Sequence, residues 1–240
     1  MVAEPAEKTA KKSTRGKRKK TEQEAVSRGV GRPARLSREA ILAASIALLE
    51  EEPVENFTLA RVAKRLDTVS MALYNYFNSR EALLCAVADE ICMGFKLRRP
   101  RAGQSWQKKL RGWLEDVHKL ADRHPVILKV LGVDGQTTAG WLRVTVTVSR
   151  TLYDEGMRGK ELAVTSYLFC SQAVALIMFE SMGASFHSAL SLNHIEELGA
   201  AEQEFVLDKL RPFHSRLTSD DILDAGFNEL IEGLERKMAG

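Results

Sequence analysis

The sequence predicts an all-α protein, with a small N-terminal helix-turn-helix domain of three helices followed by a larger helical domain. Apolar residues recur every three or four positions from residue 37 onward, which is the spacing of amphipathic helices. Serine or threonine precedes several of these segments, as expected of helix N-caps. Hydrophobic residues make up 45% of the 240 residues, so the chain can form a sizeable core.

Residues 1–35 form a basic arm that we expect to be disordered. The segment Lys8–Lys20 has eight basic residues and no acidic one, so it cannot bury enough apolar surface to offset its conformational entropy. Residues 1–38 carry a net charge of +8, which leaves −5 for residues 39–240. This asymmetry indicates a polyanionic partner, with nucleic acid as the first candidate and an anionic membrane as the second.

The arm ends in the sequence GRPAR, residues 31–35, which is similar to half of an AT-hook. Glycine and proline favour an extended chain, and Arg32 and Arg35 could follow phosphates or enter a narrow minor groove. The alternative is a tail that is simply solvated.

Composition indicates a cytoplasmic protein without a membrane association. No apolar stretch follows the N-terminal charges, as a secretory signal requires, and the longest unbroken apolar run, Ala173–Phe179, is too short to cross a bilayer. Cys85, Cys92 and Cys170 show neither a disulfide framework nor a metal-ligand spacing. We expect buried thiols, although Cys85 and Cys92 share a helix face and could sense oxidants if exposed.

The first three helices are expected between Ser37 and Phe77. Ser37 caps the first helix, which ends before Pro53 because proline restricts the residue that precedes it. Thr58 caps a second helix, a turn follows at residues 67–69, and a third helix runs from about Ser70 to Phe77. The inward side of this arrangement is apolar and contains Leu59, Val62, Ala63, Leu66, Leu73 and Phe77.

The remaining helices are expected at residues 80–97, 104–122, 125–131, 136–156, 160–187 and 219–237. Ser79 caps the first of them, and an irregular segment lies between Ser188 and Thr218. The segment VTVTV, Val144–Val148, alternates as a strand would. We assign it to a helix because Thr145 and Leu152 share a helical face with Trp141 and no second strand is available to pair with it.

Two short helices joined by a tight turn, with a third packed across them, are typical of a helix-turn-helix. In the third helix, Leu73 and Phe77 face inward, which leaves Ser70, Met71, Tyr74 and Asn75 on the opposite side. That side could face a DNA duplex, with the tyrosine hydroxyls on phosphates and the first turn at base edges.

Four segments of this region occur in a fixed order, namely ILAASIALLEEE, FTLARVAKRL, ALYNYF and SREALL. In this order and spacing, residues 38–85 resemble the DNA-binding domain of the tetracycline-repressor (TetR) family. The segment Phe227–Glu235 also looks like the closing helix of the branch with a tetracycline-repressor-like C-terminal domain.

The chain departs from the family at two places. Asp67-Thr68-Val69 replaces Gly-Val-Ser in the turn, and Pro53 replaces a glycine after the first helix. Aspartate tolerates the left-handed backbone conformation, so we expect the turn to be retained, with Thr68 or Ser70 as the cap that Val69 cannot provide.

The resemblance implies two sets of DNA-binding residues. The phosphate-binding set is Thr58, Arg61, Tyr74, Tyr76 and Arg80, where the family more often has lysine at the last position. The base-reading set is Ser70, Met71, Ala72 and Asn75; the apolar members suit thymine methyl groups. For each residue the alternative is an ordinary exposed side chain.

The resemblance further implies a transcriptional regulator with three parts: a basic arm at 1–35, a helix-turn-helix DNA-binding domain at 36–82 and a ligand-binding and dimerisation domain at 83–240. It would bind a palindromic operator in double-stranded DNA as a homodimer and, as a repressor, release it when a small-molecule effector binds. An architectural, non-specific DNA-binding protein and a helical enzyme are the alternatives. We find no nucleophile–base pair for an enzyme.

The C-terminal domain offers candidates for a self-association surface. Leu223, Phe227, Leu230 and Leu234 form one stripe, and Gly226 and Gly233 permit close helix approach. The segment Ala163–Phe186 is apolar on more than one face and therefore needs a partner on each side. Two such helices from each subunit would form a four-helix interface.

Aromatic and methionine side chains could line an effector cavity in the same domain. The candidates are Trp106, Trp113, Trp141, Phe169, Met178, Phe179, Met182 and Phe186, with a plain core as the alternative. Glu180 could anchor a cation or hydroxyl, or form a pair across the dimer. His118 and His124 lack a third convincing ligand, so we expect no metal and no cofactor.

Overall fold

The computed structural model describes residues 36–133, 135–181, 192–214 and 216–239, and none of them forms a strand. These residues belong to one compact unit, Leu36–Gly240. The basic arm, including Arg32 and Arg35, lies outside the described residues, as do Met182 and Phe186. The all-α prediction is confirmed.

Three short helices form a domain that we call the head: α1 (Arg38–Glu51), α2 (Leu59–Arg65) and α3 (Ser70–Tyr74), with a 3-10 turn at Val54–Asn56. The Ser37 and Thr58 side chains accept hydrogen bonds from the backbone N–H groups of Ala40 and Arg61, as expected of N-caps. Leu73 and Phe77 are buried, so the predicted inward side is confirmed. Helix α3 is shorter than predicted, because the chain leaves the helix after Tyr74.

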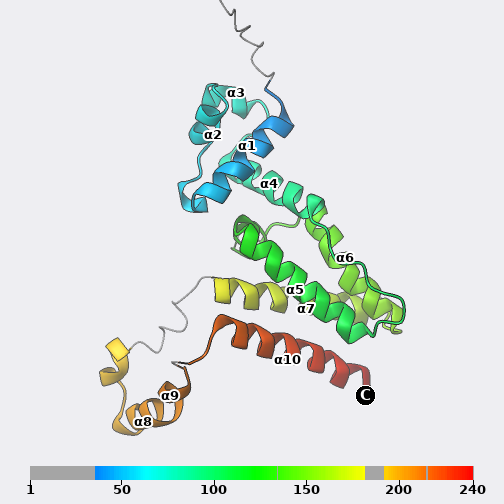
Figure 1. Ribbon diagram of the computed structural model, residues 1–240, viewed down its shortest axis with the longest axis vertical. Coiled ribbons are helices and arrows are strands. Elements are labelled where there is room, and N and C mark those ends of the chain that lie inside the picture. Colours follow the sequence, from blue (N-terminus) through cyan, green and yellow to red (C-terminus); the bar gives the residue numbers. More distant parts are fainter. Residues whose placement is uncertain (1–35, 134, 182–191, 215, 240) are drawn as a thin grey trace, which may run out of the picture. The chain divides into compact units, whose positions relative to one another are not determined.

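Helix α4 (Arg80–Gly94) joins the head to the rest of the molecule and packs against both α1 and α6. We call the remaining main helices the body: α5 (Trp106–Arg123), α6 (Ala139–Asp154), α7 (Gly159–Ser181) and α10 (Ser219–Ala239). Within the body, α6 packs on α5 and α7, and α10 lies along α5 and α7 (Figure 1). A π-helical turn at Leu128–Val133 replaces the helix predicted at 125–131.

The ambiguous VTVTV segment lies inside α6, so its assignment to a helix is confirmed. Val144, Val148 and Leu152 are fully buried, and their spacing of four residues places them on one helical face. Burial of this face against the rest of the body outweighs the strand preference of β-branched residues.

Part of the region expected to be irregular is helical. It contains a 3-10 turn at Leu192–Glu197, then α8 (Ala200–Phe205), a π-helical turn at Val206–Leu210 and α9 (Arg211–His214). Several large apolar side chains of this region are exposed, among them Phe205 and Phe213.

The apolar stripe of α10 is buried within its own chain, which corrects its assignment to self-association. Leu223, Phe227 and Leu234 are buried where α10 packs on α5 and α7. A Cβ on Gly226 would lie 2.3 Å from Leu176 Cδ2, so this glycine permits close approach of α10 to α7 of the same chain. Gly233 makes no comparable approach, since the nearest atom to a Cβ there is Arg236 Nη2 at 4.0 Å.

Helix α7 is long and apolar enough to cross a membrane by length and composition, although its unbroken apolar run, Ala173–Phe179, is much shorter. The core helix of a soluble protein meets the same criteria, and α7 packs against α5, α6 and α10. By itself this helix is therefore weak evidence for a membrane span.

Candidate nucleic-acid interface and ligand cavity

The turn between α2 and α3 is tight and is closed by backbone hydrogen bonds. Asp67 has φ +50°, the left-handed conformation predicted for it. The N–H of Thr68 donates to the Ala63 carbonyl at 3.0 Å. Val69 occupies the N-cap position of α3 and no side chain caps the helix, so the expectation of a Thr68 or Ser70 cap is wrong.

The outward side of α3 exposes large side chains beside a buried inner side. Met71 is 73% exposed, Tyr74 is 49% exposed and Asn75 is also exposed, whereas Leu73 is completely buried. Ser70 and Ala72 are half-buried at the start of the helix. Val69 adds a further exposed apolar side chain next to them. The head therefore presents a projecting set of apolar and polar groups, which suits contact with a partner.

Three of the candidate phosphate-binding side chains already have partners within the head. Arg61 forms an ion pair with Glu52. The Tyr76 hydroxyl donates to the Leu36 carbonyl at 2.7 Å. Arg80 donates from Nε to the Phe57 carbonyl at 2.8 Å and from Nη2 to the Val54 carbonyl at 2.6 Å.

These contacts hold the head together, and the assignment of these side chains to phosphate stays a prediction. Of the remaining phosphate candidates, Thr58 caps α2 through its hydroxyl. Tyr74 is exposed, and its hydroxyl has no partner in the described part of the chain. Tyr74 therefore offers a phosphate the most accessible phenolic group of α3.

A second feature is an uncharged cavity of about 690 Å³ between α6, α7 and the segment before α6. No charged residue occurs among the side chains that line it in the described part of the chain. Its apolar wall includes Leu131, Trp141, Leu162, Val174 and Met178. Of the effector candidates from the sequence, Trp141 and Met178 line this cavity.

The other aromatic candidates lie elsewhere. Trp113 and Phe169 are buried in the core with ring centroids 5.9 Å apart, and the Trp113 indole N–H donates to the Val144 carbonyl at 2.8 Å. Trp106 packs against the core, while Phe179 is exposed and Glu180 is half-buried outside the cavity lining.

Sequence reasoning missed the hydroxyl groups of the cavity, which come from Thr137, Thr145, Ser149, Ser166, Tyr167 and Ser171. The Ser166 residue is 7% exposed, and its hydroxyl has no hydrogen-bond partner among the residues that the structure describes. The spacing of four residues between Thr145 and Ser149 within an apolar helix is the signal that could have indicated them. An unpaired buried hydroxyl is costly, so a ligand group that bonds to it would be favoured.

The two buried cysteines are unsuited to redox sensing. Burial raises the pKa of the Cys92 thiol to about 12 and that of the Cys170 thiol to about 12. The thiolate is the form that reacts with oxidants, and both thiols therefore remain protonated at neutral pH. Cys92 is buried, so the condition for a sensor pair with Cys85 is not met.

Helix α6 connects the cavity to α4. The N–H of Gly140 donates to Asp89 Oδ1 of α4 at 2.6 Å, and Arg143 Nη2 donates to the Cys92 and Phe95 carbonyls, each at 2.5 Å. A Cβ on Gly140 would lie 2.5 Å from the Asp89 carbonyl oxygen, so the two helices touch at this glycine. The neighbouring Trp141 lines the cavity.

The exposed side of α3 gives the head a projecting surface, and the space beside α6 and α7 gives the body an uncharged cavity. The model for bacterial regulatory proteins of the tetR family matches residues 41–87. The chain is 37% identical over 79 residues to the class D tetracycline repressor of Escherichia coli, a match that covers 32% of this chain and 36% of that protein. It is 26% identical over 166 residues to an uncharacterised HTH-type transcriptional regulator of Mycobacterium tuberculosis, covering 65% of this chain and 75% of that protein.

Solved structures share the fold over most of the chain. Apo ActR from Streptomyces coelicolor superposes with a TM-score of 0.70 at 19% identity, covering 86% of this chain and 98% of ActR. A TetR variant from Acinetobacter baumannii in complex with minocycline gives a TM-score of 0.63 at 19% identity, covering 85% and 96%. The tetR family model matches the head and the start of α4, and the sequence match spans about a third of the length of the tetracycline repressors.

Proposed function

We propose that this protein is a transcriptional repressor that binds a palindromic DNA operator as a homodimer and releases it when a small molecule fills the uncharged cavity. The exposed side of α3 carries this proposal. Met71 and Tyr74 project from the outward side of α3, whose inner residue Leu73 is buried, in a head that matches the family model for bacterial regulatory proteins of the tetR family. A helix with this exposure suits the major groove.

The two exposed side chains have different roles in this proposal. Met71 lies in the first turn of α3 and contacts a base edge, where its thioether chain suits a thymine methyl group. Tyr74 lies one turn later and donates its hydroxyl to a phosphate, which positions the helix without reading sequence.

The effector is an uncharged molecule with an extended apolar or aromatic surface and at least one hydrogen-bonding group. A charged ligand would lose its hydration without gaining an opposite charge, since the described lining contains none. Trp141 and Tyr167 provide aromatic faces, and the buried Ser166 hydroxyl provides the polar anchor. Structures of similar fold are complexes with actinorhodin or with minocycline, which supports a small-molecule effector.

Effector binding reaches the head through α6. Trp141, Leu142 and Thr145 line the cavity, while Gly140 and Arg143 hold α4. A ligand that displaces this part of α6 therefore shifts α4, and α4 packs directly on α1 of the head. Only a ligand with different affinities for the two arrangements can move the equilibrium.

The homodimer is supported by an exposed apolar stripe on α7. Val164 and Leu168 are 44% and 49% exposed, and their spacing of four residues places them on one helical face. A second copy of the chain would cover this stripe and provide two heads for two half-sites one helical turn apart or a multiple of it. Light scattering should then give twice 26.7 kDa.

Selection of bound sequences from random duplex DNA tests this function. We expect enrichment of a palindrome, and footprints with two related half-sites. Binding without any enriched sequence would instead support the architectural protein driven by the basic arm. With the operator known, uncharged polycyclic compounds should release it, while matched carboxylate derivatives should not.

A further inference from the structure

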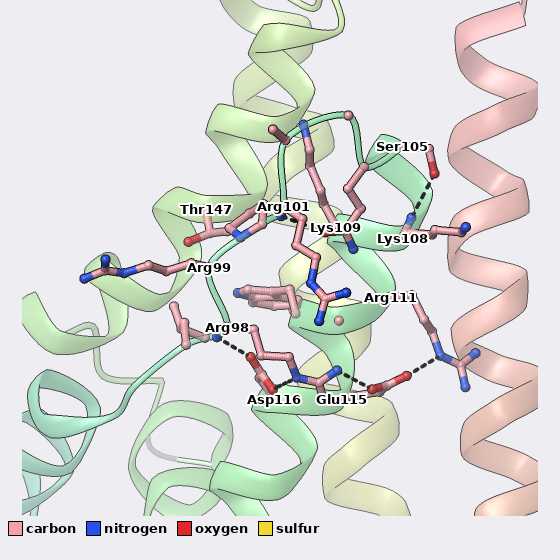
Figure 2. A pocket seen from close by; sticks show the side chains of 17 residues that line it. Arg98, Arg99, Arg101, Ser105, Lys108, Lys109, Arg111, Glu115, Asp116 and Thr147 are labelled. Atoms are coloured by element: carbon pink, nitrogen blue, oxygen red, sulfur yellow. Dashed lines mark hydrogen bonds and ion pairs between the residues drawn. The ribbon is translucent and has the colours of Figure 1, made fainter.

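A second cleft is basic and lies beside the start of α5. It has a volume of about 730 Å³ and is formed by the connector after α4, residues 97–105, and the first turns of α5. Figure 2 shows basic side chains from both segments around it. Six basic residues and two acidic residues line it, whereas residues 39–240 as a whole carry a net charge of −5.

Two of the basic side chains are neutralised by acidic partners, and one of them, Arg98, holds the connector against α5. Arg98 donates from Nε to Asp116 Oδ1 at 2.7 Å and from its backbone N–H to Asp116 Oδ2 at 2.8 Å, and Asp116 is 6% exposed. Arg98 also forms an ion pair of 2.9 Å with Glu115. Arg111 pairs with Glu115 (Figure 2) and also with Asp224 of α10.

The other four basic side chains, Arg99, Arg101, Lys108 and Lys109, have no acidic partner in the described part of the chain. Lys108 and Lys109 lie in the first turn of the 18-residue helix α5, which contains no acidic residue there. The N-terminal end of a helix carries a partial positive charge, so cations are unfavourable at this position. A bound anion would remove both the mutual repulsion and the unfavourable interaction with the helix dipole.

This cleft is distant from the DNA-binding surface. The opposite end of α5 is the one near the head, where His124 Nδ1 lies 4.0 Å from Glu50 of α1. Eighteen residues of α-helix span about 27 Å at 1.5 Å per residue. The cations at the start of α5 are therefore not part of the surface that α3 presents to a duplex.

We propose that this cleft binds a small, multiply charged anion of the oligophosphate class. Arginine guanidinium groups can hold phosphate oxygens through paired hydrogen bonds, and the two lysines add point charges from the facing helix. The volume is within the range of small-molecule sites. A single charge would leave most of the four cations uncompensated, whereas an oligophosphate can contact connector and helix together.

Hydrogen–deuterium exchange of the full-length protein with inorganic triphosphate, at constant ionic strength, tests this site. The basic arm will also attract triphosphate, so the readout must be local. We expect slower exchange in peptides that cover residues 97–112. No change there, with triphosphate bound only elsewhere on the chain, would overturn the proposal. Protection of these peptides by non-operator duplex DNA but not by triphosphate would also overturn it.

A pair of matched double variants completes the test. The double variant Arg101→Gln, Lys109→Gln should need about ten times more triphosphate for the same protection from exchange, because charge-assisted hydrogen bonds are lost. Lys160→Gln with Lys237→Gln removes the same charge from exposed positions outside the cleft and should leave the protection unchanged. Equal losses in both variants would show a general charge effect and contradict the site. Without ligand, the melting temperature of the first variant should not be lower than that of the wild type, because the substitutions remove only unpaired cations.

Discussion

The head and the body both expose apolar side chains to solvent, but the surface on the head is convex and the one in the body is concave. On the head, Met71 and Val69 project outward from a helix of five residues. In the body, Trp141 and Met178 line the wall of a concave cavity. A projecting set suits the groove of a large partner, whereas a concave set encloses a small molecule. The two regions are therefore expected to bind different classes of ligand, and substitutions should separate them.

The largest effect is expected at the buried side of α3. Leu73→Ala should lower the free energy of unfolding by about 2–5 kcal/mol, because it removes a fully buried side chain and leaves a cavity. Urea denaturation measures this loss. The exposed neighbour variant Met71→Ala is the control and should unfold close to the wild type. Equal destabilisation by both variants would show that the two sides of α3 are assigned incorrectly.

A smaller loss of stability is expected where α6 touches α4. Gly140→Ala should cost about 1–3 kcal/mol of overpacking, because the new Cβ would lie 2.5 Å from the Asp89 carbonyl oxygen. It should also change the effector concentration needed to release DNA. Gly94→Ala is a matched control, since no atom lies within 4 Å of a Cβ there. An unchanged effector response in a folded Gly140→Ala protein would argue against coupling through α6.

A substitution in the cavity wall should raise the free energy of unfolding instead of lowering it. Ser166→Ala removes a buried, unpaired hydroxyl and should raise the free energy of unfolding by about 1 kcal/mol. It should also weaken effector binding if this hydroxyl bonds to the ligand. Thr165→Val is the control, because its hydroxyl is also buried and unpaired but does not line the cavity. Denaturation and effector titration of both variants separate stability from binding.

The head could be predicted from the sequence in more detail than the body. Its helix caps at Ser37, Thr58 and Ser79 depend on neighbours three residues away, and its turn depends on the local tolerance of Asp67 for positive φ. Such features are encoded within a few residues. The cap of α3 was the exception, because the turn is closed by backbone hydrogen bonds and a side-chain cap is absent.

The body depends on contacts between residues far apart in the sequence. The stripe on α10 is apolar whether it covers its own chain or a second copy, so its periodicity could not show that it packs on α5 and α7. Trp113 and Trp141 are both tryptophans within amphipathic helices, so the sequence does not distinguish them. In the structure, Trp113 donates to the Val144 carbonyl in the core, whereas Trp141 lines the cavity. The basic cleft arises only when the connector folds against α5.

The prediction at Tyr74 concerns operator binding instead of the free energy of unfolding. Tyr74→Phe removes one hydroxyl that we assign to a phosphate, and it should weaken operator binding by about 1 kcal/mol, the net contribution of a typical hydrogen bond. The loss should be the same for every operator variant, because phosphate contacts carry no sequence information. A change in base preference with Tyr74→Phe would place this side chain at a base edge instead.

The central claim, that the outward side of α3 reads DNA sequence, is tested most directly by measuring the affinity of Met71→Ala for a library of single-base operator substitutions. We predict that discrimination is relaxed at one symmetric pair of positions, while affinity for unrelated DNA is nearly unchanged. Retention of the wild-type base preferences at every position, in a folded Met71→Ala protein, would contradict the account.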